Sequence, residues 1–268
     1  MNHGKIIPMS KRLIIGNWKM NPGTPEEAKK LVRKTKRAAL GLVKTEIVVC
    51  PPFPFLTACV PRKKEANFKV GAQSVSAEEG VGARTGEVSA TMVRAIGAEY
   101  AIVGHSEQRK VGESGNSDTD ETVSKRLNAA LNAGLVVILC VGEKARDENG
   151  TYLEELKNQI KNSLLNTPKK FASKIIIAYE PVWAIGAQEA MNSEQIYETS
   201  IFVRKIFADV FGADNGLKAK VLYGGAVNFR NAYEIMTVGK VDGLLVGRES
   251  VNAPGFVELI KAVDKITA

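Results

Sequence analysis

Long hydrophobic runs and cysteines are both scarce in this sequence. The longest apolar run, LVVILCV at 135–141, has the length of a strand and is too short to cross a membrane. The first residues, MNHGKIIPMSKR, lack the apolar segment of a signal peptide. Three cysteines occur, at positions 50, 59 and 140, and their spacing matches neither a disulfide framework nor a metal-binding motif. We therefore expect a cytoplasmic protein with reduced cysteines, no membrane partner and no metal.

Signatures of nucleic-acid binding are also absent, although the net charge is +8. The sequence contains no Cys/His finger spacing and no aromatic-rich strand motif. Much of the excess charge lies in EEAKKLVRKTKRAAL at 26–40, where the basic residues face away from an apolar stripe, as on a solvated helix face. We expect no nucleic-acid partner, and the positive charge would instead attract a small anionic substrate.

Short β-branched runs alternate with longer amphipathic segments along the whole chain. Near-continuous apolar strands are typical of parallel strands that are buried on both faces. Eight such units in about 250 residues fit a closed barrel, so the pattern predicts an α/β protein with a single-domain (β/α)8 barrel at 12–268, after a flexible extension at 1–11. The predicted strands are 13–16, 46–50, 68–73, 100–104, 135–141, 174–180, 220–225 and 241–247, and the predicted helices are 25–40, 87–96, 119–133, 151–164, 193–211, 228–236 and 255–266. Prolines make 52–67 the poorest helix.

Polar side chains and glycines follow the predicted strands at the end where the active sites of such barrels lie. Asn17 and Lys19 follow the first strand, His105 the fourth and Glu180 the sixth, and the last two strands end in glycine. Together these groups suit proton transfer on a phosphorylated carbonyl compound. Each has an ordinary alternative, such as a surface lysine, a structural histidine or a glutamate in an ion pair. Their shared location favours catalysis.

Five segments in order, GNWKMN, GHSEQR, CVGE, AYEPVWAIG and YGGAVN, resemble the triosephosphate isomerase family. The segments GAQSVS…TGEVS at 71–89 and DGLLVG at 242–247 extend the resemblance over nearly the whole chain from residue 12 onward. It implies a TIM barrel that interconverts dihydroxyacetone phosphate and glyceraldehyde 3-phosphate, in glycolysis and gluconeogenesis, without metal or cofactor. This family is itself a standard example of pKa tuning and of lid closure.

The resemblance implies a role for each polar residue at the strand ends. Glu180 is the expected general base, a desolvated carboxylate that moves a proton between adjacent carbons. His105 is the expected electrophile, as a neutral imidazole. Lys19 adds positive charge near the substrate oxygens, Asn17 orients the carbonyl side, and Glu107 holds Lys19 in place.

A lid and a phosphate site are expected around these residues. Pro181 and Trp183 would form a stiff hinge and 184–186 the moving tip. Tyr223 would hydrogen-bond the closed lid, while Cys140 and Glu143 would support the site by packing and by an ion pair. The expected lid comprises Pro181, Val182, Trp183, Ala184, Ile185, Gly186, Ala187 and Gln188, and the expected phosphate-binding backbone N–H groups belong to Gly186, Ala226, Gly247 and Arg248, in addition to the side chains of Asn17 and Lys19.

The departures from the family's usual pattern cluster in the lid and phosphate site. Ala187, Gln188, Ala226 and Arg248 replace a threonine, a glycine, a serine and a glycine, and Gln108 stands where an arginine is common. They put lid speed and phosphate geometry in question rather than the reaction type. We expect the Arg248 side chain to leave the pocket toward acidic groups such as Glu249, while its backbone N–H binds phosphate. A direct contact between the guanidinium and the phosphate is the alternative.

The segment 71–87 is long, rich in small residues and without a helical period. The resemblance makes it a loop that inserts into a second subunit near Lys19, with Thr85 at the partner's site, and so implies a homodimer. Two alternatives to an active isomerase stay open. One is a barrel that binds a phosphorylated metabolite without efficient turnover, as the lid and phosphate-site changes would allow. The other is a different phosphosugar enzyme on the same fold, which would need other base residues.

Overall fold

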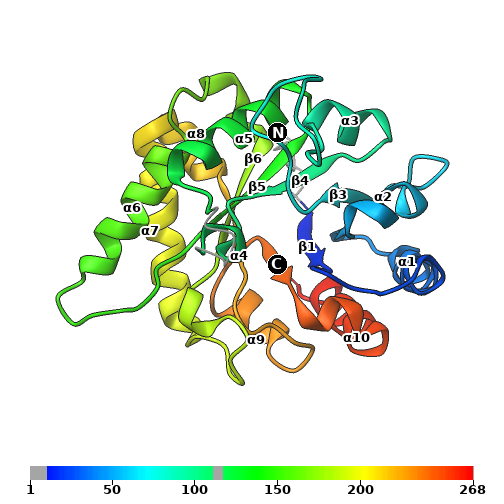
Figure 1. Ribbon diagram of the computed structural model, residues 1–268. Helices are drawn as coiled ribbons and strands as arrows, with labels where there is room; N and C mark the ends of the chain where they lie inside the picture. The colour runs from blue at the N-terminus through cyan, green and yellow to red at the C-terminus, as the bar shows by residue number, and fades with distance from the viewer. Residues whose placement is uncertain (1–10, 111–116, 268) are drawn as a thin grey trace, which may run out of the picture.

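Eight parallel strands close into a barrel in sequence order (Figure 1). The computed structural model describes residues 11–110 and 117–267, so the expected extension at 1–11 lies, apart from Lys11, outside the described residues. The strands are β1 (Arg12–Asn17), β2 (Thr45–Cys50), β3 (Phe68–Ala72), β4 (Tyr100–Val103), β5 (Val136–Val141), β6 (Ile175–Tyr179), β7 (Lys220–Tyr223) and β8 (Gly243–Val246). The predicted single-domain (β/α)8 barrel is confirmed.

Helices surround the barrel, and the first and last of them lie side by side, α1 in blue and α10 in red (Figure 1). None of the described helices is long and apolar enough to cross a membrane. The α-helices are α1 (Pro25–Ala39), α2 (Phe53–Cys59), α3 (Ala90–Ala95), α4 (Ser106–Arg109), α5 (Asp120–Asn132), α6 (Thr151–Ser163), α7 (Ser193–Phe211), α8 (Ala213–Lys218), α9 (Ala232–Thr237) and α10 (Ala253–Asp264). The 3-10 helices are η1 (Lys169–Lys174), η2 (Val182–Ala184) and η3 (Arg248–Val251).

Two helices differ from their predicted extent for local reasons. The segment 52–67 forms only the seven-residue helix α2. Pro54 lies in its first turn, where a missing N–H costs no hydrogen bond, and Pro61 follows the C-cap Val60, where the helix has ended. The helix predicted at 228–236 begins only at Ala232. The side chain of Asn228 accepts hydrogen bonds from the backbone N–H groups of Arg230 and Asn231 and forms a turn before the helix.

Alternation along the strands decides which side chains face the barrel interior. The interior core contains Leu13, Ile15, Val48, Cys50, Tyr100, Ile102, Ile138, Cys140, Ile176, Ala178, Leu222 and Leu245. Because successive residues of a strand point to opposite faces, Asn17 continues the inward set of β1 and Glu180 that of β6. The inward positions of two separated strands therefore deliver two predicted site residues to the same end of the barrel.

Candidate active site

A pocket of about 820 Å³ opens at the carboxyl ends of the strands. Its lining brings together the four residues with expected chemical roles, Asn17, Lys19, His105 and Glu180. The residues predicted around them also line it, namely Glu107, Ile185, Gly186, Ala187, Gln188, Ala226, Gly247 and Arg248. We call the first group the floor of the pocket. The lid tip forms the rim together with Ala226, Gly247 and Arg248.

Glu180 is fixed between two neighbouring strands. Its backbone N–H donates to the carbonyl of Val141 over 2.8 Å, and its side chain is buried. A Cβ at Gly142 would collide with the backbone carbonyl of Glu180, and one at Gly224 would lie 2.7 Å from its Cγ. Glycine at both positions therefore leaves the space that the buried glutamate occupies.

His105 faces Glu180 because the chain turns sharply before it. Gly104 has a φ of 72°, a left-handed conformation that breaks the alternation of β4. The turn is held by Arg109, whose Nε donates to the carbonyl of Gly104 over 2.7 Å and whose Nη1 pairs with Asp120 at 2.6 Å. Nε2 of His105 then lies 3.3 Å from Oε1 of Glu180.

A backbone hydrogen bond selects the tautomer of His105. Its Nδ1 accepts from the backbone N–H of Glu107 at 3.2 Å, so a neutral ring carries its proton on Nε2, the atom that faces Glu180. Neither sequence pattern nor composition reveals this arrangement, because it depends on the turn into α4.

The direct contact between Glu180 and His105 shifts both of their pKa values. Burial lowers the pKa of His105, but the charge and hydrogen bond of Glu180 outweigh it, and the pKa lies above its ordinary value of 6.5. Burial raises the pKa of Glu180, but His105, the Cys140 thiol and Lys19 together lower it below 4.5. This contact therefore stabilises the charged forms of both side chains.

Lys19 adopts a strained backbone conformation at the floor of the pocket. Its φ is 53°, which is uncommon for a residue other than glycine. Its N–H donates to Oδ1 of Asn17 at 3.0 Å, and its carbonyl accepts from Nε2 of Gln73 at 2.7 Å. Its ammonium group forms an ion pair with Glu107, and its Cε would lie 3.6 Å from a Cβ at Gly247. Sequence reasoning missed Gln73, although it lies inside the GAQSVS segment.

The hinge of the lid is tied to a fully buried carboxylate. Oε1 of Glu143 accepts from the indole Nε1 of Trp183 at 3.1 Å and from the hydroxyl of Tyr179 at 2.8 Å. Arg146 pairs with the same oxygen at 2.9 Å. Glu143 therefore anchors the start of η2, while the lid residues 186–188 are exposed.

Tyr223 and Ala226 differ in what they offer the lid. The Tyr223 hydroxyl accepts a hydrogen bond from the backbone N–H of Met191, three residues beyond the predicted lid, at 3.0 Å. Ala226 has no hydroxyl to make a second such bond. Gln188 makes no side-chain hydrogen bond within the part of the chain that the structure describes, so it does not replace that contact.

The Arg248 side chain lies toward the lid tip, and no ion pair joins it to Glu249 among the described residues. Arg248 begins η3, and a Cβ at Gly186 would lie 3.8 Å from its Nη2, so the guanidinium reaches the lid tip. Glu249, the acidic neighbour expected to hold it, instead accepts from Nδ2 of Asn252 at 3.1 Å.

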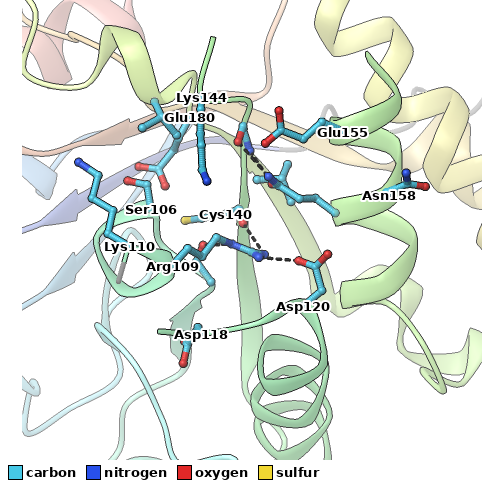
Figure 2. Close-up of a pocket in the computed structure, with 15 residues that line it drawn as sticks. Ser106, Arg109, Lys110, Asp118, Asp120, Cys140, Lys144, Glu155, Asn158 and Glu180 are labelled. Carbon is cyan, nitrogen blue, oxygen red and sulfur yellow. Dashed lines mark hydrogen bonds and ion pairs between the residues drawn. The ribbon is translucent and has the colours of Figure 1, made fainter. Parts of the chain in front are cut away.

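A second cavity of about 610 Å³ lies behind Glu180. Figure 2 shows the Glu180 carboxylate, the Ser106 hydroxyl and the Cys140 sulfur facing one another at its edge. Burial, aided by the charge of Glu180, raises the pKa of the Cys140 thiol well above its ordinary value. Cys140 therefore stays a neutral thiol that packs beneath the carboxylate and can donate to it.

Thr85 does not join the pocket of its own chain. It lies exposed in the segment 71–87, where Val81 is also exposed, and neither residue lines the pocket.

Within residues 11–110 and 117–267, no group of three or more His, Cys, Asp or Glu side chains is placed to hold a metal ion.

Comparisons with known proteins agree with this geometry. The family model described as triosephosphate isomerase matches residues 12–263. A triosephosphate isomerase of Endomicrobium trichonymphae is 41% identical over 254 residues, which cover 94% of this chain and 99% of that protein. One from Clostridium perfringens strain SM101 is 40% identical over 94% of this chain and 99% of its own length. One from Dictyoglomus thermophilum is 35% identical over 95% of this chain and 100% of its own length.

Proposed function

The chain belongs to the triosephosphate isomerase family, and we propose that it interconverts dihydroxyacetone phosphate and D-glyceraldehyde 3-phosphate through an enediolate, with Glu180 carrying the proton. Membership makes the protein an isomerase of the intramolecular oxidoreductase class. The observation that carries the proposal is the facing pair of Glu180 and His105, 3.3 Å apart at the floor of the pocket, with Lys19 beside them. The proposed pathways are glycolysis and gluconeogenesis.

The phosphate group binds first at the rim. Backbone N–H groups of Gly186, Ala226, Gly247 and Arg248 are proposed to surround it, because these residues line one side of the pocket. Lys19 lies next to Gly247 and supplies positive charge there. Binding at the rim places the carbonyl end of the substrate between Glu180 and His105.

His105 and Lys19 then polarise the carbonyl. Nε2–H of His105 donates to the carbonyl oxygen, as the hydrogen bond at Nδ1 dictates for the neutral ring. A substrate between the two side chains replaces the contact with Glu180 that raises the pKa of His105, while burial continues to lower it. The neutral imidazole required for this role is therefore favoured in the complex. Asn17 orients the same end of the substrate through its side-chain amide.

Glu180 transfers the proton between the two carbons. Its carboxylate takes a proton from the carbon next to the carbonyl, and the electron pair moves to the carbonyl oxygen to give the enediolate. A proton then moves between the two enediolate oxygens, and Glu180 returns its proton to the other carbon. One carbon is oxidised and its neighbour is reduced by the same amount, so the reaction needs no external oxidant or reductant.

The lid at 181–188 covers the base during this transfer. The contacts of Trp183 with Glu143 and of Met191 with Tyr223 hold its two ends, so the exposed tip is the part that moves. Closure excludes water and strengthens the basicity of the desolvated carboxylate.

We also propose a homodimer in the cytoplasm. Residues 78–87 of the segment 71–87 are exposed, and Met20, next to Lys19, is 94% exposed, which leaves an uncovered surface beside the pocket. In the proposed dimer this segment inserts beside Lys19 of the second copy, and Thr85 reaches the partner's site. Three free buried cysteines, Cys50, Cys59 and Cys140, suit a reducing compartment.

Steady-state kinetics test the proposed activity. Purified protein should convert glyceraldehyde 3-phosphate to dihydroxyacetone phosphate, with a kcat of at least about 1 per second, the lower end of the usual range for enzymes. Retained binding of phosphoglycolate, a phosphate compound whose carboxylate imitates the enediolate, with no turnover would support the binding-only alternative instead.

A further inference from the structure

We propose that the guanidinium of Arg248 binds the substrate phosphate together with the lid tip, which makes Arg248 a specificity-determining residue for a phosphate dianion. This inference rests on the proposed function, because it assumes that the phosphate lies at the rim. It goes beyond that function in assigning the side chain, and not only the backbone N–H, to the ligand.

The position of the side chain is the first support. Nη2 of Arg248 would lie 3.8 Å from a Cβ at Gly186, so the guanidinium stands against the backbone of the lid tip. Both residues line the same pocket. A phosphate on the backbone N–H of Gly186 would therefore be within reach of the guanidinium.

The second support is that the guanidinium has no carboxylate partner among the described residues. Glu249 accepts from Asn252, and the pocket carboxylate of Glu107 pairs with Lys19. An arginine fork matches two phosphate oxygens and stays charged at every physiological pH. Arg248 is thus a cation at the rim whose charge is neutralised by no acidic side chain in the part of the chain that the structure describes.

The third support is the arrangement of the two cations around Gly247. Lys19 lies on one side of this residue, with its Cε 3.6 Å from the Cβ position, and Arg248 follows it directly in the chain. The ammonium is held by Glu107 at the floor, whereas the guanidinium extends to the lid. The two charges therefore contact different parts of the same ligand site.

This arrangement offers a reason why the protein can lack a hydroxyl at Ala226 to hold the closed lid. A phosphate held by both the lid tip and the guanidinium would connect the lid to η3 when the ligand is bound. The lid would then close in response to the phosphate itself, and a substrate without that group would gain nothing from Arg248.

The decisive experiment compares substrates with and without phosphate. Arg248→Gln keeps the length of the side chain and removes its charge, and Lys110→Gln removes a charge from another residue of the same pocket. Phosphoglycolate and inorganic phosphate are titrated calorimetrically into both variants and the parent, and kcat/KM is measured for glyceraldehyde 3-phosphate and for glyceraldehyde. Thermal midpoints show whether each variant is folded.

The proposal predicts that Arg248→Gln weakens phosphoglycolate binding at least about fivefold and lowers kcat/KM for the phosphorylated substrate to match. In Arg248→Gln, kcat/KM for glyceraldehyde should change less than about twofold. In Lys110→Gln, the phosphoglycolate affinity and both kcat/KM values should change less than about threefold. Arg248→Lys should recover part of the loss, because it restores the charge without the fork.

Either of two results would overturn the role of Arg248. One is a loss of less than about fivefold in Arg248→Gln, and the other is an equal loss for both substrates, which indicates a general structural effect. If the parent turns over its substrate and Arg248→Gln behaves like it, the isomerase proposal stands and this inference fails. If the parent binds phosphoglycolate through Arg248 but has no turnover, this inference stands and the isomerase proposal fails. If the parent binds no phosphoglycolate, both fail.

Discussion

The floor and the rim of the pocket are built in different ways. At the floor, Glu180 and His105 are 3% and 5% exposed, and interstrand or backbone hydrogen bonds fix both. At the rim, the lid residues 186–188 and Arg248 are exposed. The floor therefore depends on the barrel itself, whereas the rim consists of loop residues at the surface.

This difference explains where the sequence can vary. A change at Gly142 or Gly224 would displace Glu180, because a Cβ at either position meets its backbone or side chain. Gln188 is exposed and Ala226 is half-buried, and most of the departures from the family's usual pattern fall in the lid and the phosphate site. Chemistry is expected to depend on the floor, and ligand affinity and lid closure on the rim.

The largest expected effect comes from removing the base at the floor. Glu180→Gln keeps the shape of the side chain but cannot accept the proton, so kcat should fall at least about 10²-fold. Phosphoglycolate affinity should be largely kept, since the rim is intact. Glu249→Gln, the same substitution at another glutamate that lines the pocket, is the matched control and should retain kcat. Unchanged turnover in Glu180→Gln would refute the assignment of the base.

A smaller loss is expected when the proposed dimer is broken. Val81→Glu with Thr85→Glu places two like charges on the exposed part of this segment and should give a monomer with roughly tenfold lower activity, because buried unpaired charges oppose association. Light scattering and kinetics at the same concentration measure both properties. Leu217→Glu, at an exposed position on α8, is the control and should leave the dimer intact. A fully active monomer would argue against the proposed role of the segment 71–87.

The pKa of His105 offers a test of the floor alone. Its raised pKa means that Glu180 stabilises the protonated ring, so kcat/KM should fall as the pH drops through that pKa. Glu180→Gln removes the main cause, and burial then lowers the pKa of His105 below the parent value.

Imidazole NMR can follow this titration directly. The sequence has two histidines, and His3→Gln leaves the signal of His105 alone. An equal pKa in His3→Gln with and without Glu180→Gln would show that the two side chains do not interact in solution.

The smallest effect is expected at the rim. Ala226→Ser restores a hydroxyl that can bond the closed lid, and one such bond contributes about 0.5–1.5 kcal/mol. Phosphoglycolate should therefore bind a few times more tightly. Tyr223→Phe is the reciprocal variant, because it removes the observed contact with Met191 and should weaken binding by a similar factor. Unchanged affinity in both variants would show that these hydrogen bonds do not control closure.

The sequence was most informative where a site residue follows directly from its strand. Glu180 could be placed because β6 is an apolar run whose alternation continues to the base. Gln73 and Arg109 could not be assigned their contacts, because these join segments far apart in the chain or depend on the turn at Gly104. The shift in the pKa of His105 could not be predicted from the pattern, because it depends on the distance between His105 and Glu180.

The orientation of Arg248 marks the limit of such reasoning. A long exposed side chain has many rotamers, and its direction depends on which neighbours are already paired. Only the structure shows that Asn252 engages Glu249 and that the guanidinium lies at Gly186. Strand ends can thus be predicted from the pattern, and rim side chains require the tertiary structure.

Isomerisation in deuterium oxide tests the central claim most directly, namely that the floor moves a proton through an enediolate on Glu180. Glyceraldehyde 3-phosphate is incubated with the protein, and the product is examined by proton NMR. The account predicts dihydroxyacetone phosphate with deuterium at the carbon that receives the proton, because the proton on the carboxylic acid can exchange with solvent before it is returned. Glu180→Gln should form neither product nor label at a comparable rate. Conversion without any deuterium at that carbon, or labelled product from Glu180→Gln at the parent rate, would contradict it.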